Sequence, residues 1–212
     1  MTVPGRSPSS LLPVPAKAVS VLIASLEKYH PLTPAVKDFI KTHLHMRKLP
    51  RKTFILKSGQ ACKELCFIYK GIVRGYMLEE EREITTWINT EGELVSSIAA
   101  LAAQSPSPEN IETLSYAEIL VLDLEKLNQA YEVFPETNIL ARKLLQQYYA
   151  DAENRAFIAR LTKAEIKYRY FLNRHPSLSH RVPLKYVASF LGMTLETLSR
   201  TRKKKSNTGK FS

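Results

Sequence analysis

The 212-residue sequence predicts an α+β protein: an N-terminal antiparallel β-roll with flanking helices, a long dimerisation helix, and a C-terminal helix-turn-helix domain with a truncated wing. Three observations lead to this prediction. Short apolar or alternating runs separated by turn residues fill residues 47–124, which is typical of a small antiparallel barrel or sandwich. Helical periodicity returns at Leu124. Within residues 182–205 a glycine joins two short amphipathic segments, as in a helix-turn-helix.

The chain before the strand-rich region divides into an arm and two helices. Residues 1–17 begin with a stretch rich in proline and serine, which predicts a flexible N-terminal arm. Two helices are expected at 18–29 and 33–44, and Thr33-Pro34 has the residue types of an N-cap and a first helical position. Together with the strands, these helices make up a predicted domain over residues 18–134.

The strand-rich region contains six runs that we expect to be strands, because each is short, apolar and bounded by turn signals. They are residues 53–56, 65–69, 72–78, 84–88, 111–114 and 119–124. A short helix over 125–134, ended by Pro135, closes the domain.

The next helix, from Glu136 to Arg160, is long and has an apolar stripe wider than one buried face needs. The stripe consists of Ile139, Leu140, Leu144, Leu145, Tyr148, Tyr149, Ala152, Ala156 and Phe157. One side is expected to pack on the roll and the other on a twin helix, which predicts a homodimer with residues 135–160 as connecting and dimer helix. The alternative is a helix buried within one chain.

A new domain is expected near Leu161. The sequence Thr162-Lys163-Ala164-Glu165 has the pattern of a capping box, which predicts a helix over 163–173 and opens a DNA-binding domain at 161–212. The chain stops soon after the second helix of the motif, so the wing is expected to be truncated.

The two-helix motif turns at Gly192, because glycine tolerates the left-handed conformation that a tight turn needs. Thr194 is the expected cap of the second helix and a candidate DNA-binding residue, and Leu195 and Leu198 are expected to face inward. Four polar residues of this helix are left to face base edges in the major groove: Glu196, Thr197, Ser199 and Arg200. The alternative is a plain helical hairpin with a solvated charged face.

Charge is concentrated around this motif. Residues 160–212 hold 13 of the 31 lysines and arginines and two of the 20 acids, so they carry the whole net charge of +11. Concentrated positive charge indicates a polyanionic partner, here double-stranded DNA. Phosphate contacts are assigned to Lys185, Lys203, Lys204 and Lys205.

Other features exclude several classes of protein. The longest apolar run near the N-terminus, 18–24, is too short to span a bilayer and lacks the flanks of a signal peptide. Two cysteines, Cys62 and Cys66, fit a reducing cytoplasm and are expected to be ordinary buried thiols. No metal site, cofactor or catalytic residue is predicted, because phosphate loops and clustered ligands are absent from the sequence.

Several motifs resemble those of the Crp/Fnr superfamily of bacterial transcription regulators. They are Gly59-Gln60, the run 67–74, Glu91-Gly92-Glu93-Leu94 and Glu196-Thr197-Leu198-Ser199-Arg200. The resemblance runs from about residue 20 onward. It implies a cyclic-nucleotide-binding-like roll and base reading by Glu196, Ser199 and Arg200. It also implies a ligand pocket, formed by Gly92, Glu93, Leu94, Ser96 and Ser97. The compact form of residues 186–192 is similar to members from Bacteroidetes-type bacteria.

One departure from the family pattern bears on the effector. Members that bind cyclic AMP follow the Gly-Glu pair with an Arg-Ser/Thr-Ala run, whereas the corresponding stretch here is Ser107-Pro108-Glu109-Asn110. No arginine lies between Arg82 and Arg142, so a cyclic phosphate would meet carboxylates without a guanidinium.

These observations predict a dimeric, sequence-specific DNA-binding regulator that reads a palindromic operator, is not cyclic-AMP-dependent and is not an enzyme. RNA polymerase and an unidentified small-molecule effector are further candidate partners. The alternative is a module that binds a small molecule or cyclic nucleotide, with a basic C-terminal segment that binds nucleic acid non-specifically. A constitutive DNA binder with an empty roll is a third reading. The sequence shows neither effector nor operator, nor the direction of regulation, nor a redox role for the cysteines.

Overall fold

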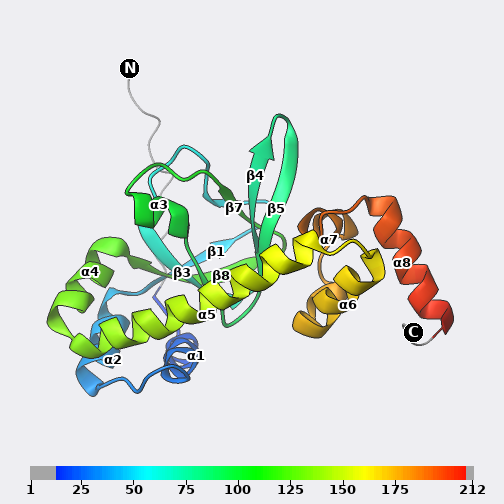
Figure 1. The fold of residues 1–212 in the computed structure, drawn as a ribbon. Coiled ribbons are helices and arrows are strands. Elements are labelled where there is room, and N and C mark those ends of the chain that lie inside the picture. The colour runs from blue at the N-terminus through cyan, green and yellow to red at the C-terminus, as the bar shows by residue number, and fades with distance from the viewer. Residues whose placement is uncertain (1–12, 209–212) are drawn as a thin grey trace. The chain divides into compact units, whose positions relative to one another are not determined.

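A computed structural model describes residues 13–208 and, beyond Lys204, only the backbone (Figure 1). Contacts divide the chain into two compact units. The first contains Met1–Val73 and Asn89–Leu144, and the second contains Arg74–Ile88 and Leu145–Ser212. Of the predicted arm, residues 1–12 lie outside the described residues, and the first helix already begins at Ala16. The domain boundaries inferred from sequence stay a prediction.

The first unit contains most of the strands and the N-terminal helices (Figure 1). Its helices are α1 (Ala16–Glu27), α2 (Pro34–His43), α3 (Ile98–Ala103), α4 (Leu124–Val133) and the first part of α5 (Pro135–Arg160). Its strands are β1 (His45–Leu49), β2 (Phe54–Leu56), β3 (Glu64–Lys70), β6 (Leu94–Val95), β7 (Asn110–Thr113) and β8 (Ala117–Asp123).

The strands of the first unit pair antiparallel. One sheet has the order β1-β8-β3-β6, and in it Glu64 pairs with Asp123 and His45 with Val121. In a second sheet, β2 pairs with β7 and an irregularity separates Phe54 from Leu56. The predicted α+β class with an antiparallel roll and flanking helices is confirmed.

An apolar core in the first unit joins α1, α2 and α5 to the first sheet. It is built from buried side chains of α1, the α1–α2 connection, α2, β1, β3, β8 and α5: Ala18, Leu22, Leu26, Leu32, Val36, Ile40, Met46, Phe67, Leu120 and Leu140. Leu140 and Leu144 thus use one side of the α5 stripe to close this core, as predicted. At the start of α2, the Thr33 hydroxyl accepts a hydrogen bond from the Val36 amide at 3.4 Å, which confirms the predicted cap.

The second unit combines a β-hairpin with the C-terminal helices. The hairpin strands are β4 (Val73–Glu79) and β5 (Arg82–Asn89), of which residues 74–88 belong to this unit. The helices are the last part of α5, then α6 (Ala164–Arg174), the short 3-10 helix η1 (Leu178–His180), α7 (Leu184–Phe190) and α8 (Leu195–Thr208). Gly75 in β4 lies so close to Trp87 that an added Cβ would fall 2.1 Å from the indole ring. The hairpin therefore requires glycine at this position.

Some local predictions were wrong. The capping box at Thr162 does not form: α6 has Lys163 as its N-cap without a side-chain cap bond, and Glu165 instead pairs with Lys204 at 3.4 Å. Leu195 is 44% exposed, while Leu198 is fully buried, so only Leu198 faces inward. The strands β1 and β6 and the short helix α3 were not predicted.

Candidate nucleic-acid interface

The turn between α7 and α8 has the geometry of a helix-turn-helix. Gly192 adopts a φ of +59°, in the left-handed region that favours glycine. The Met193 amide donates to the Ala188 carbonyl at 3.0 Å, which closes the end of α7. The Thr194 hydroxyl then accepts from the Thr197 amide at 3.2 Å and caps α8. The predictions for Gly192 and Thr194 are therefore confirmed.

A compact core holds the two helices together. Val187 and Ala188 of α7, Leu191 in the turn, Leu198 of α8 and Phe171 of α6 are each at most 2% exposed. Ala188 lies where a larger side chain would separate the helices, because protein cores are close-packed. This packing fixes the direction in which the outer face of α8 points.

The four polar residues predicted to read bases lie on that helix with different exposure. Glu196 and Arg200 are exposed and four residues apart, so they lie on the same face of α8. Thr197 and Ser199 are half-buried. The Thr197 hydroxyl lies 3.1 Å from the Thr194 hydroxyl and 3.5 Å from an Arg200 nitrogen, so the side chains of this face are ordered relative to one another.

Glu196 is held in its charged form. Hydrogen bonds from its own backbone amide and from the Thr194 hydroxyl, together with the charge of Arg200, hold the pKa of Glu196 below its usual range. The carboxylate is an acceptor at neutral pH, as the recognition of a cytosine amino group requires.

The predicted phosphate-contacting lysines are placed on the surface of the same unit. Lys185, Lys203 and Lys204 are exposed, and the side chain of Lys205 lies outside the described residues. The Lys185 ammonium lies 4.8 Å from the centre of the Tyr186 ring. Lys204 forms an ion pair with Glu165, and this pair contributes little to stability because it is largely exposed.

One cation of the basic segment does not face solvent. Lys167 of α6 is 7% exposed, and its ammonium donates to the carbonyls of Ala159 and Leu191, both at 3.0 Å. Ala159 lies in the last turn of α5 and Leu191 caps the C-terminus of α7. Carbonyls at helix C-termini lack partners within the helix and attract cations. Lys167 therefore fastens α5 and α7 to α6 beside the turn, a role that charge counting alone did not predict.

The hairpin supplies a second set of residues that sequence reasoning missed. Arg74 is 1% exposed, and its guanidinium carbon lies 4.1 Å from the centre of the Tyr76 ring and 4.0 Å from that of Tyr186 on α7. The Arg74 guanidinium also pairs with Glu83 and donates to the Thr85 hydroxyl at 3.3 Å. The available sequence signal was a charged residue near the start of an otherwise apolar predicted strand, because a charge in such a strand needs a partner.

His175 follows α6 and is half-buried, with ring centres 5.5 Å from Phe171 and 6.4 Å from Phe190. Burial, with the positive charges of Arg174 and Arg155, lowers the pKa of His175 below its ordinary value despite the nearby carboxylate of Asp151. The neutral imidazole is therefore the form that the folded unit prefers.

We expect this histidine to make the second unit less stable in acid. Because its folded pKa is depressed, its contribution is present above the ordinary histidine pKa and is lost as pH falls through the lower folded value. The free energy of unfolding, measured with urea at pH 7.5 and pH 5.5, should fall less in His175→Gln than in the parent protein. His180→Gln, an exposed histidine of the same unit, is the control. An identical fall in His175→Gln and the parent would contradict this assignment.

The predicted ligand pocket lies in the first unit, and its polar groups bond to neighbouring parts of the roll. Gly92 has a φ of +89°, and its amide donates to the Ile68 carbonyl at 2.9 Å. The Glu93 carboxylate accepts from the Thr90 amide at 2.6 Å, and Leu94 pairs with Phe67 across β6 and β3. The buried Ser97 hydroxyl accepts from Ser107 at 3.1 Å.

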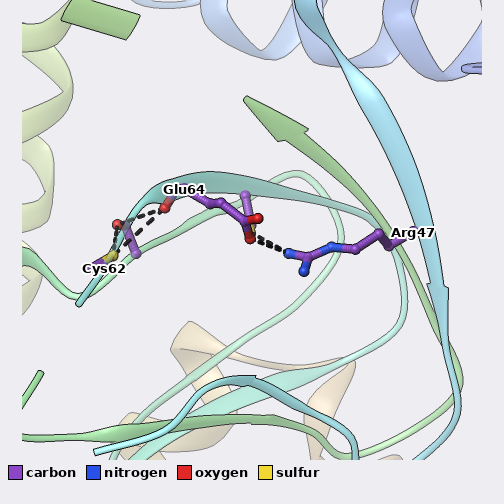
Figure 2. A network of polar contacts seen from close by, with 5 residues as sticks. Arg47, Cys62 and Glu64 are labelled. Carbon is purple, nitrogen blue, oxygen red and sulfur yellow. Dashed lines mark hydrogen bonds and ion pairs between the residues drawn. The ribbon is translucent and has the colours of Figure 1, made fainter. Parts of the chain in front are cut away.

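Figure 2 shows a polar network that includes Arg47 of β1, Glu64 of β3 and Cys62, and Ser96 is bonded to this network. The Ser96 hydroxyl donates to the Glu64 carbonyl at 3.2 Å and lies 3.2 Å from the Cys62 sulfur. The Glu64 carboxylate pairs with Arg47 at 2.5 Å, and both side chains are largely buried. The Arg47 guanidinium also lies 3.7 Å from the Cys66 sulfur.

The two thiols differ in their surroundings. Cys66 is 2% exposed, and burial raises its pKa to about 12, so it is a neutral and unreactive thiol. Cys62 is half-buried, so the prediction of two buried thiols is confirmed for Cys66 and was wrong for Cys62.

A roll, a long helix and a helix-turn-helix follow one another in this order along the chain, as the resemblance to the Crp/Fnr superfamily implies for the fold. Residues 46–134 match the cyclic nucleotide-binding domain family. No curated protein sequence matches the chain. None of the helices in residues 13–208 combines the length and apolar character that a bilayer span requires.

Solved structures of similar fold include three regulators. FixK2 from Bradyrhizobium japonicum is 18% identical, with a TM-score of 0.68 over 80% of this chain and 88% of its own. A regulator assigned to the Crp/Fnr family from Eubacterium rectale is 19% identical, with a TM-score of 0.66 over 87% and 91%. The c-di-GMP-responsive global regulator CLP from Xanthomonas campestris is 20% identical, with a TM-score of 0.64 over 82% and 91%. The resemblance to the Crp/Fnr superfamily is thereby confirmed at the level of the fold; its Bacteroidetes-type detail stays a prediction.

Proposed function

We propose that this protein is a dimeric transcription regulator that binds DNA sequence-specifically through α8. The observation that supports this most directly is the exposed face of Glu196 and Arg200, beside a capped and tightly packed turn. Around it, the C-terminal segment carries the whole net charge of the chain. A helix presented in this way fits the major groove, with exposed lysines beside it for the phosphates. Such a DNA target would place the protein in the cytoplasm.

The test is selection of bound duplexes from a random pool, followed by sequencing. The proposal predicts an enriched motif of two inverted half-sites whose centres are about 34 Å apart, or about ten base pairs. Binding that enriches no motif, yet weakens steeply with salt, would overturn sequence-specific recognition and favour the alternative of non-specific nucleic-acid binding.

The proposed dimer interface is the uncovered side of α5. Leu145 is 53% exposed, Tyr149 is 67% exposed, and the two are four residues apart on one face. Ala152 and Ala156 extend the same face and are exposed. A stripe of this kind is suited to packing against the same helix of a second copy.

We expect Tyr149→Glu to weaken the dimer about a hundredfold or more, because it places a charge in the centre of an apolar helix pair. Sedimentation equilibrium at several protein concentrations measures this directly. Gln146→Glu, which introduces the same charge at an exposed neighbouring position, is the matched control and should leave the dimer intact. Equal behaviour of the two variants would mean that this face of α5 is not the interface.

We further propose that the protein is not cyclic-AMP-dependent and has no enzymatic activity. The hydroxyl of Ser97 and the carboxylate of Glu93 already have partners within the roll, and the sequence between Arg82 and Arg142 offers no guanidinium for a phosphate. Thermal unfolding with cyclic AMP, cyclic GMP and c-di-GMP tests the proposed independence of cyclic AMP. A ligand at a hundred times its Kd adds about 2.7 kcal/mol to the free energy of unfolding. A shift with cyclic AMP would overturn the proposal, and a shift with c-di-GMP would identify an effector.

A further inference from the structure

Helix α7 is bonded to the edge of the β4–β5 hairpin by one side chain. The Ser189 hydroxyl accepts a hydrogen bond from the Thr85 amide at 2.9 Å and donates one to the Glu83 carbonyl at 3.1 Å. Residues 83 and 85 point their backbone groups to the same side of β5, because strand geometry repeats every two residues. The Ser189 hydroxyl therefore satisfies one backbone N–H and one backbone carbonyl at the edge of β5, as a neighbouring strand would.

A second contact lies one helical turn earlier. Tyr186 is 2% exposed and stacks on the buried Arg74 guanidinium, which Glu83 neutralises. Tyr186 and Ser189 are three residues apart, so they lie on the same face of α7. The hairpin thus holds α7 at two points, by a hydrogen-bonded hydroxyl and by a cation–π contact.

Because α8 is packed on α7 across the turn at Gly192, the contacts of the hairpin with α7 also bear on the orientation of α8. Between the hairpin and the start of α8 lies a cavity of about 320 Å³, lined on one side by Arg82 and Glu83 and on the other by Thr194 and Leu195. Thr194, Glu196 and Arg200 stay exposed while the hairpin is attached to α7. The contact between the hairpin and α7 therefore leaves these α8 side chains accessible to DNA. The hydrogen bonds and the cation–π contact described above join the hairpin to α7.

We propose that the β4–β5 hairpin is a working part of the DNA-reading unit, and that Ser189 is a positioning residue that orients α7 and, through it, α8. This inference rests on the proposed sequence-specific function. Pre-orienting the helices removes part of the ordering cost of binding an operator. Non-specific binding, which depends on phosphate contacts rather than on exact orientation, does not need the attachment.

The experiment compares Ser189→Ala with Ser189→Thr, which keeps a hydroxyl, and with Ser20→Ala. Ser20 is the matched control, because its hydroxyl bonds only the Ala16 carbonyl of its own helix among the contacts described and lies in the first unit. We expect Ser189→Ala to lower affinity for the selected operator about threefold to tenfold. Affinity for random-sequence DNA should stay unchanged, and Ser189→Thr should restore operator binding. Hydrogen exchange should accelerate in the peptide over residues 82–89 of Ser189→Ala and nowhere in Ser20→Ala.

A second measurement uses only the parent protein. If the hairpin and the DNA-reading helices are coupled, operator DNA must slow exchange in residues 82–89, because coupling is reciprocal. Unchanged exchange on operator binding, equal loss of specific and non-specific affinity in Ser189→Ala, or tighter operator binding by that variant would each overturn the inference. If the parent protein selects no operator, the proposed function fails, while exchange in Ser189→Ala without DNA still tests the attachment itself.

Discussion

Arg200→Ala is expected to weaken operator binding by about 1–3 kcal/mol, which is about 5- to 150-fold in Kd. The Arg200 side chain is exposed on the same face as Glu196, and a guanidinium in that position is suited to bidentate pairing with guanine O6 and N7. The loss should be largest for the operator with its contacted guanine and small for an operator in which that base pair is replaced. Titration of both duplexes at fixed salt gives the difference.

The control for Arg200→Ala is an exposed lysine of the same helix. Lys203→Ala removes the same charge, and we expect it to weaken binding to all sequences alike and to reduce the salt slope by about one. The two variants separate base reading from phosphate contact. If Arg200→Ala also weakened every duplex equally, Arg200 would be a phosphate contact and the assignment of base reading to it would be wrong.

Lys167→Met is expected to destabilise the second unit by about 2–4 kcal/mol, because it leaves two helix-terminal carbonyls without their donor. The Leu191 carbonyl is the more consequential of the two, since its hydrogen bond with Lys167 is buried beside Gly192. Methionine preserves most of the volume of the lysine stem, so the loss reports the hydrogen bonds rather than a cavity. Urea unfolding followed by circular dichroism measures the change.

Lys163→Met is the matched control for this variant. It changes net charge equally, but Lys163 is exposed and should alter stability by less than about 0.5 kcal/mol. Equal stability of the two variants would mean that the Lys167 ammonium contributes nothing that water cannot supply. Operator affinity of folded Lys167→Met would further show whether the turn keeps its geometry without the lysine.

Much of the fold was predictable from the sequence because the deciding signals are local. The six predicted strands and the long helix all appear, with boundaries shifted by a few residues. β6 has two residues and exists through pairing with β3, so no pattern within it is long enough to detect. The capping box failed because α6 begins one residue later than the box requires, with Lys163 rather than Thr162 at the N-cap position.

In the candidate interface, too, local features could be predicted from the sequence and features that depend on packing could not. Gly192 and Thr194 were identified because a left-handed turn and a helix cap restrict residue type within a few positions. Leu195 was misplaced, although Leu198 three residues later was not, because Leu195 is the first residue of α8 and borders an open cavity, so it stays 44% exposed. The roles assigned to Glu196, Ser199 and Arg200 stay predictions until DNA binding is measured.

The elements, the turn chemistry and the confinement of charge to the C-terminal segment could all be predicted from the sequence, since each depends on residues near one another in the chain. The buried hydrogen bond from the Lys167 ammonium to the Leu191 carbonyl became visible only in the tertiary structure. The same is true of the contacts by which Arg74 and Ser189 join the β4–β5 hairpin to α7. The Ser189 contacts link residues more than 100 positions apart. The partners of a buried charge or a half-buried hydroxyl are chosen by packing, and packing brings together residues whose separation in sequence carries no signal.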